Sequence, residues 1–204
     1  MVIRTLPVVI LLAGTFAIVA ACGHSPAAPS PDSAASIASP SIAPGAASAP
    51  SPQMVTDGRP NIMVNMHDAC EPDSFNAAAG PGTCVRNGGV LFDNFIAQLT
   101  ANQFVGAWHF APGVANARVG ETFLASNTGG EVHTFTEVAD FGGGIVPPLN
   151  QLSGNPNVAP ECTALEADDF VAPGQTYHET VDHAGTVKFQ CCIHPWMRLV
   201  ATVK

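Results

Sequence analysis

Short stretches of alternating apolar and polar residues run through most of the chain, and turn residues separate them. Alternation with a period of two is typical of strands that bury one face. The first is Asn61-Ile-Met-Val-Asn-Met66, and the others span residues 107–110, 117–125, 131–138, 169–172, 176–181, 186–192 and 199–203. Turn signals such as Pro112-Gly113 and Pro173-Gly174 lie between them. This pattern predicts an all-β fold, an antiparallel β-sandwich.

Two segments depart from the strand pattern. Apolar residues recur at helical spacing between Leu91 and Leu99, and Asp93 or Asn94 is placed to cap the first turn, so we expect a short helix there. Residues 141–161 are rich in Gly, Pro and Asn and predict a long surface loop.

The N-terminus has the features of an export signal. Arg4 precedes an apolar run at residues 8–21, which is too short to cross a bilayer comfortably. The run ends in Val19-Ala20-Ala21-Cys22, which resembles the lipobox of bacterial lipoproteins. The resemblance implies cleavage before Cys22 and a lipid on that cysteine. A plain signal peptide followed by an unrelated cysteine is the alternative.

Composition divides the rest of the chain. Residues 23–60 are mainly Ala, Ser and Pro and cannot bury a core. We therefore expect a lipoprotein signal peptide at 1–22, a disordered tether at 23–60 and a folded domain at 61–204. Export would place the domain on the periplasmic or cell-surface side of the membrane, held there by lipid, where disulfides persist.

Charge and missing motifs exclude several functions. The chain has 16 acidic and 7 basic residues, a net charge of −9, which argues against nucleic-acid binding and favours a basic partner. The acidic cluster Glu161, Glu166, Asp168 and Asp169 is either a solvated loop or a docking patch for such a partner. Gly-x-Ser-x-Gly, phosphate-loop, His-Glu-x-x-His and His-x-His motifs are absent from the sequence.

The stretch Phe189-Gln-Cys-Cys-Ile-His-Pro-Trp-Met197 carries the most specific chemistry. Cys191, His194 and Met197 follow one another at spacings of three and offer a thiolate, an imidazole and a thioether. Soft ligands of this kind select copper, and two His, one Cys and a weak axial Met make up the blue-copper electron-transfer site. The second histidine must come from elsewhere, and His133 is the best candidate.

Several segments resemble the cupredoxins, the family of type 1 blue copper proteins. Residues 189–203 are similar to the family's copper loop, with the Cys-x-x-His-x-x-Met spacing of amicyanin, shorter than the plastocyanin loop. Residues 127–133 resemble its upstream histidine strand, and Pro173-Gly174 resembles its turn before the cysteine strand. The resemblance covers residues 104–204 and implies a Greek-key β-sandwich. Residues 61–103 form an extension with no counterpart, as a cap, an edge strand or a docking element.

The resemblance also implies roles for individual residues. Four residues would bind one copper ion: His133, Cys191 and His194 in the trigonal plane, and Met197 axially. His194 would reach the surface within an apolar patch to which Pro195 and Trp196 contribute. Thr134 stands where the family often has Asn, and its hydroxyl is expected to bond the cysteine loop instead.

Lipid on Cys22 and copper on Cys191 would leave four cysteines for disulfide bonds. These are Cys70, Cys84, Cys162 and Cys192, which allow three pairings. Neighbouring strand residues face opposite sides, so Cys192 points away from the copper if Cys191 faces it. We expect Cys70 to pair with Cys84 and Cys162 with Cys192; a free, buried Cys192 is the alternative.

Together these features predict a membrane-anchored, exported protein that carries single electrons between redox partners and is not an enzyme. One alternative is a copper-trafficking protein without redox turnover. The other is a small copper enzyme with an open coordination position.

Overall fold

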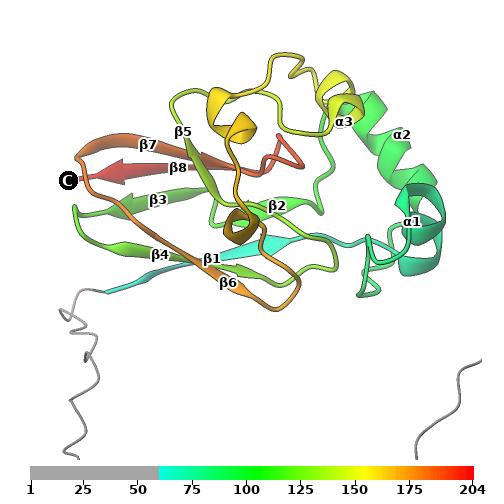
Figure 1. The fold of residues 1–204 in the computed structure, drawn as a ribbon, viewed down its shortest axis with the longest axis horizontal. Helices are drawn as coiled ribbons and strands as arrows, with labels where there is room; N and C mark the ends of the chain where they lie inside the picture. Colours follow the sequence, from blue (N-terminus) through cyan, green and yellow to red (C-terminus); the bar gives the residue numbers. More distant parts are fainter. Residues whose placement is uncertain (1–59) are drawn as a thin grey trace, which may run out of the picture. The chain divides into compact units, whose positions relative to one another are not determined.

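The computed structural model describes residues 60–204, which form two four-stranded sheets packed face to face (Figure 1). The first has the order β2-β1-β4-β6, with β1 at Ile62–His67, β2 at His109–Ala111, β4 at Thr122–Asn127 and β6 at Thr176–Thr180. The second has the order β3-β8-β7-β5, with β3 at Val114–Ala117, β5 at Thr136–Val138, β7 at Gly185–Gln190 and β8 at Arg198–Val203. The all-β sandwich is confirmed. The expected signal peptide, Cys22 and nearly all of the expected tether lie outside the described residues.

Each sheet contains one parallel pair, β1 with β4 and β3 with β8, whereas the other pairs are antiparallel. The expected antiparallel β-sandwich therefore includes one parallel pair in each sheet. A parallel pair needs a long crossover, and the chain between β1 and β4 provides one through two helices and the second and third strands. Since β1 lies between β2 and β4, the extension supplies an internal strand of the first sheet.

The core lies between the sheets and is rich in aromatic rings. Phe135 stacks on Phe189 with ring centroids 4.4 Å apart, and Phe123 lies 5.2 Å from Phe189. All three rings are buried, as the alternating pattern requires. Aromatic pairs of this kind add stability beyond the apolar area that they bury.

Three helices gather at the end of the sandwich where the β7–β8 loop lies (Figure 1). They are α1 at Pro72–Ala79, α2 at Phe92–Asn102 and α3 at Pro147–Leu152. The expected helix is α2, but its N-cap is Leu91, without a side-chain cap, so the predicted caps Asp93 and Asn94 were wrong. In α1, which the sequence analysis missed, the Glu71 carboxylate accepts the capping hydrogen bonds. None of the helices within residues 60–204 is long and apolar enough to cross a membrane.

The segment 141–161 is not the surface loop that we expected. It contains α3 and the start of a short 3-10 helix at Pro160–Thr163; a second 3-10 helix follows at Ala167–Asp169. The Ile145 amide donates to the Cys192 carbonyl at 2.7 Å, and the buried Asn150 side chain bonds both backbone groups of Gly144. Gly144 allows close approach to the backbone of Cys192, whereas Gly142 and Gly143 allow the segment to pack closely on itself.

Both expected disulfides, Cys70–Cys84 and Cys162–Cys192, are present. The second joins the 3-10 helix at Pro160–Thr163 to the residue beside Cys191, and it is buried with Val138 and Ala159 in a small separate core. Within residues 60–204, Cys191 is the free cysteine.

Gly144→Ala is expected to lower the free energy of unfolding by roughly 1–3 kcal/mol, as is typical of overpacking. A Cβ at Gly144 would overlap the backbone carbonyl of Cys192, which cannot move without disturbing the cysteine strand. Chemical denaturation measures the change, and Gly106→Ala is the matched control because a Cβ there meets no atom within 4 Å. Equal stability of the two variants would contradict the prediction.

Candidate metal centre

Three side chains converge at one end of the sandwich: Cys191 and His194 from one loop, and His133 from a distant part of the chain. The Cys191 sulfur lies 3.8 Å from His133 Nδ1 and 3.9 Å from His194 Nδ1. The three ligand atoms all lie within 4.8 Å of one another, and none of the three residues is more than 2% exposed. Metal–sulfur and metal–nitrogen bonds of about 2.3 and 2.0 Å, about 120° apart, would separate the ligand atoms by about 3.7 Å. The arrangement therefore fits a single ion bound in a trigonal plane.

The β7–β8 loop places two of these groups. Cys191 directly follows β7, and its amide donates to the Met197 carbonyl at 3.0 Å. The Met197 amide in turn donates to the His194 carbonyl at 2.9 Å. These two bonds turn the loop back on itself and bring the His194 ring close to the Cys191 sulfur. The Met197 side chain is fully buried.

His133 reaches the centre from the chain between β4 and β5. Its backbone exchanges two hydrogen bonds with Val171, which fixes the backbone where the ring leaves it. The next residue, Thr134, donates its amide to the Cys191 sulfur at 3.4 Å, and its hydroxyl accepts from the Cys192 amide at 2.8 Å. Thr134 thus bonds the cysteine loop, in the place where a hydrogen-bonding residue was expected.

The sequence analysis missed Asp68, which orients His133. The Asp68 carboxylate lies 2.9 Å from His133 Nε2 and accepts the amides of Gly130 and Glu131. A Cβ at Gly129 would overlap this carboxylate, which explains the glycine pair before the histidine. A proton on Nε2, shared with Asp68, leaves Nδ1 free to bind a metal.

Electrostatics favour a thiolate at Cys191. Burial would raise the pKa of the Cys191 thiol, but the hydrogen bonds and positive charges of His133 and His194 hold it well below its usual value. Burial opposes the charge of His133 as well, yet its bonds to Asp68 and Cys191 raise its pKa to about 9. Burial would also raise the pKa of Asp68, but the bond from His133 and two backbone amides keep it below its usual range.

His194 does not reach the surface as expected, because it is only 2% exposed. The ring of Phe95, from α2, meets it edge to face at 6.4 Å, and Trp196 does so at 5.5 Å. Its Nε2 atom lies 3.6 Å from the Glu131 carboxylate, another group that the sequence analysis missed. Phe95 belongs to the extension at residues 61–103, whereas Trp196 belongs to the β7–β8 loop. Pro195 is buried as well, and Trp196 is half-buried.

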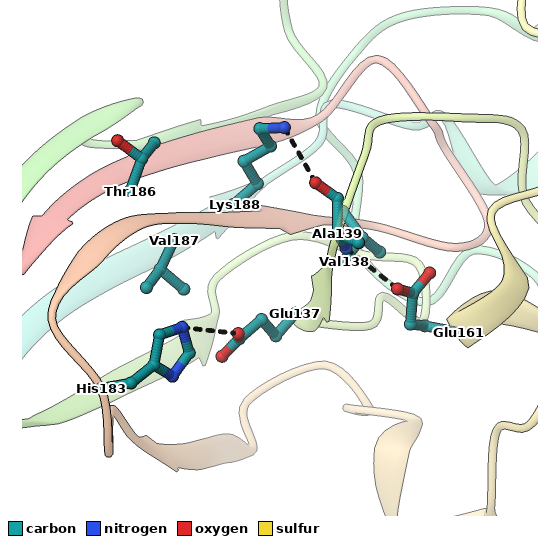
Figure 2. A pocket seen from close by; sticks show the side chains of 8 residues that line it. All are labelled: Glu137, Val138, Ala139, Glu161, His183, Thr186, Val187 and Lys188. Carbon is teal, nitrogen blue, oxygen red and sulfur yellow. Dashed lines mark hydrogen bonds and ion pairs between the residues drawn. The ribbon is translucent and has the colours of Figure 1, made fainter.

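The acidic cluster lies at the surface, with Glu166 and Asp168 exposed and Glu161 and Asp169 half-buried, and a docking role stays a prediction. The Glu161 carboxylate accepts the Ala139 amide at 2.9 Å, in the groove beside β5 and β7 that Figure 2 shows. Glu166 and Asp169 form a capping box of a 3-10 helix. Three of the four acids therefore have local structural partners.

Comparisons with known proteins identify no close relative. No protein-family model matches the chain, and no curated protein does. Among solved structures, a novel purple cupredoxin from Nitrosopumilus maritimus aligns with 71% of this chain and 100% of its own, at 14% identity and a TM-score of 0.40. A reduced tryptophan-to-tyrosine mutant of amicyanin aligns with 49% of this chain and 77% of its own, at 21% identity and a TM-score of 0.34. Scores of this size carry no argument about function, which therefore rests on the geometry of the site.

Asp68→Asn is expected to weaken metal binding by about 10- to 100-fold, the usual effect of losing a carboxylate that orients a histidine ligand. Competition titrations with Zn²⁺, a redox-inert probe, measure the change. Asp140→Asn is the matched control, because Asp140 also pairs with a cationic side chain, Lys188, but lies exposed and away from the centre. Equal Zn²⁺ affinities of the two variants would show that Asp68 does not support a metal ligand.

The pH dependence of Zn²⁺ binding is expected to show the release of one proton. With its pKa of about 9, His133 carries at neutral pH a second proton, on Nδ1, that the metal must displace, whereas the lowered pKa of Cys191 favours the thiolate before the metal binds. The logarithm of the apparent affinity should therefore rise by about one per pH unit up to about pH 9 and then level off. Titrations with a competing chelator give this slope, and a slope near zero or near two contradicts the assignment.

Proposed function

We propose that the chain is a mononuclear type 1 copper protein that carries single electrons between redox partners outside the cytoplasm. The observation that carries the proposal is the buried Cys191 sulfur with two imidazole Nδ1 atoms at 3.8 and 3.9 Å. One thiolate and two imidazoles in a plane are the ligand set of blue-copper sites. Met197, buried on the same loop, is the proposed weak axial ligand.

The residues around the centre suit electron transfer because they hold the ligands still. Asp68 fixes the His133 ring, and the amides of Thr134 and His194 point at the Cys191 sulfur from 3.4 and 3.5 Å. When bound, copper supplies a one-electron couple between Cu(II) and Cu(I). Ligands that move little between two charge states keep the cost of reorganisation low, and hydrogen bonds to the sulfur tune the potential.

Burial favours an electron carrier over an enzyme at this centre. The three ligand side chains are at most 2% exposed, so water and substrates have little access to the ion. Trp196 is half-buried and contacts the His194 ring, so we propose it as the route between the centre and a partner. The acidic surface, with a net charge of −9, suits a basic partner.

The proposed location is the extracytoplasmic side of a membrane, with a lipid anchor on Cys22. Two buried disulfides in a domain of this size are typical of an oxidising compartment. The lipobox-like sequence before Cys22 supports the anchor.

Loading the protein with Cu(II) is expected to give an intense visible band from thiolate-to-copper charge transfer and a narrow copper hyperfine splitting in the spin-resonance spectrum. Cys191→Ser should abolish the band, because the sulfur is its source. His178→Ala is the matched control, since His178 is exposed on β6, and it should keep both spectra. A Cys191→Ser spectrum like that of the unmodified protein contradicts the site, and a colourless protein that binds Cu(I) alone supports copper trafficking instead.

A further inference from the structure

A cavity of about 380 Å³ lies beside the metal centre, between α1, α2 and α3. Phe75, Phe92 and Phe95 line it from α1 and α2, and Leu149 and Leu152 line it from α3. Pockets for small molecules begin at about 300 Å³, and a dry cavity of about 150 Å³ holds one benzene. The size and the aromatic walls therefore suit a molecule of one or two rings.

The cavity is open to the outside. Ala79, at the end of α1, is exposed and lines it, and the apolar side chains Phe92 and Leu149 are only half-buried. These side chains come from three separate helices that leave apolar surface facing one another. A ligand can enter between the helices without unfolding the sandwich.

Three polar side chains also line the cavity: Thr83, Glu131 and His194. Trp108 Nε1 donates to Glu131 Oε2 at 2.6 Å, whereas no donor among residues 60–204 bonds the other carboxylate oxygen. Glu131 is only 7% exposed. A carboxylate oxygen in an apolar wall that accepts no hydrogen bond from the protein gains free energy from a ligand that donates one.

The charge around these groups selects the kind of ligand. The carboxylates of Glu131 and Asp68 lie close to each other, and no Lys or Arg of the described residues forms an ion pair with Glu131. An anionic head group beside Glu131 would face the repulsion of both carboxylates in this apolar surrounding, where charges interact strongly. A donor head group, neutral or cationic, meets complementary charge.

We propose that this cavity is a binding site for a small aromatic molecule whose head group donates a hydrogen bond to Glu131. The bound ring packs among the phenylalanines of α1 and α2 and against His194. The ligand thereby contacts a residue of the metal centre without bonding the metal. The site rests on the cavity alone and does not depend on which metal the centre binds.

Four probes of equal ring size test the site in the full-length, metal-free protein, by calorimetry and by ligand-observed NMR. Phenol is a neutral donor and benzylamine a cationic one, whereas toluene lacks a head group and benzoate is anionic. At least one donor probe is expected to bind tenfold or more tightly than toluene and benzoate. The donor probe that binds more tightly shows whether the natural ligand has a neutral or a cationic head group.

Two variants locate the binding. Ala79→Trp narrows the entrance and should weaken binding of the donor probe at least tenfold, whereas Ala78→Trp, exposed on the same helix and outside the cavity, should not. In Glu131→Gln the side-chain amide oxygen can still accept the hydrogen bond from Trp108. The NH₂ group of the amide then faces the ligand in place of a carboxylate oxygen. The preference for donor probes should therefore disappear. Thermal unfolding of each variant checks that it folds.

The proposal is overturned if neither donor probe binds, if toluene or benzoate binds as tightly, or if Ala79→Trp and Glu131→Gln both bind like the unmodified protein. Because these measurements use metal-free protein, they do not depend on the copper spectra. A protein that fails to bind copper can still bind the donor probe, and a blue protein can fail to do so.

Discussion

The hydrogen bond between Asp68 and His133 is the contact on which the metal centre depends. It joins the end of β1, in the N-terminal extension, to the segment that carries one of the proposed ligands. Both side chains are essentially buried, so the bond forms where charge-assisted interactions are strong and where an unpaired carboxylate would be costly. The extension is therefore part of the centre, since β1 is an internal strand of the first sheet and Asp68, directly after β1, sets the direction of an imidazole.

The extension also decides how the centre meets solvent. Its helices α1 and α2 cover the end of the sandwich, and Phe95 of α2 lies over His194. The same cover leaves an apolar hollow with the Glu131 carboxylate in its wall. Shielding of the ion and a space for a small ligand thus arise from one addition to the sandwich.

Local sequence patterns were enough to predict the features that residues close together in the chain determine, namely the strands and the Cys191–His194 loop. The spacing of Cys191 and His194 on one tight loop is chemically specific, and the alternating strands predicted the sandwich. Asp68 could not be found in this way, because its partner His133 is 65 residues away and a lone acid after a strand carries no distinctive pattern. The exposure of His194 was predicted wrongly for a similar reason, since the Phe95 ring that covers it lies on α2, far away in the sequence. Segment 141–161 has the composition of a loop, but Gly144 serves close packing against the backbone of Cys192.

The position of Cys191 directly beside a disulfide has a consequence for how the protein matures. Cys192 pairs with Cys162, and the free cysteine Cys191 stands next to that bond in the chain. A thiolate attacks disulfides through a mixed intermediate, so an immature chain in an oxidising compartment is exposed to scrambling of its pairs. The fold counters this by directing the two neighbouring sulfurs into separate cores. The Cys162–Cys192 disulfide therefore has to form, and Cys191 has to stay unpaired, during the same folding event.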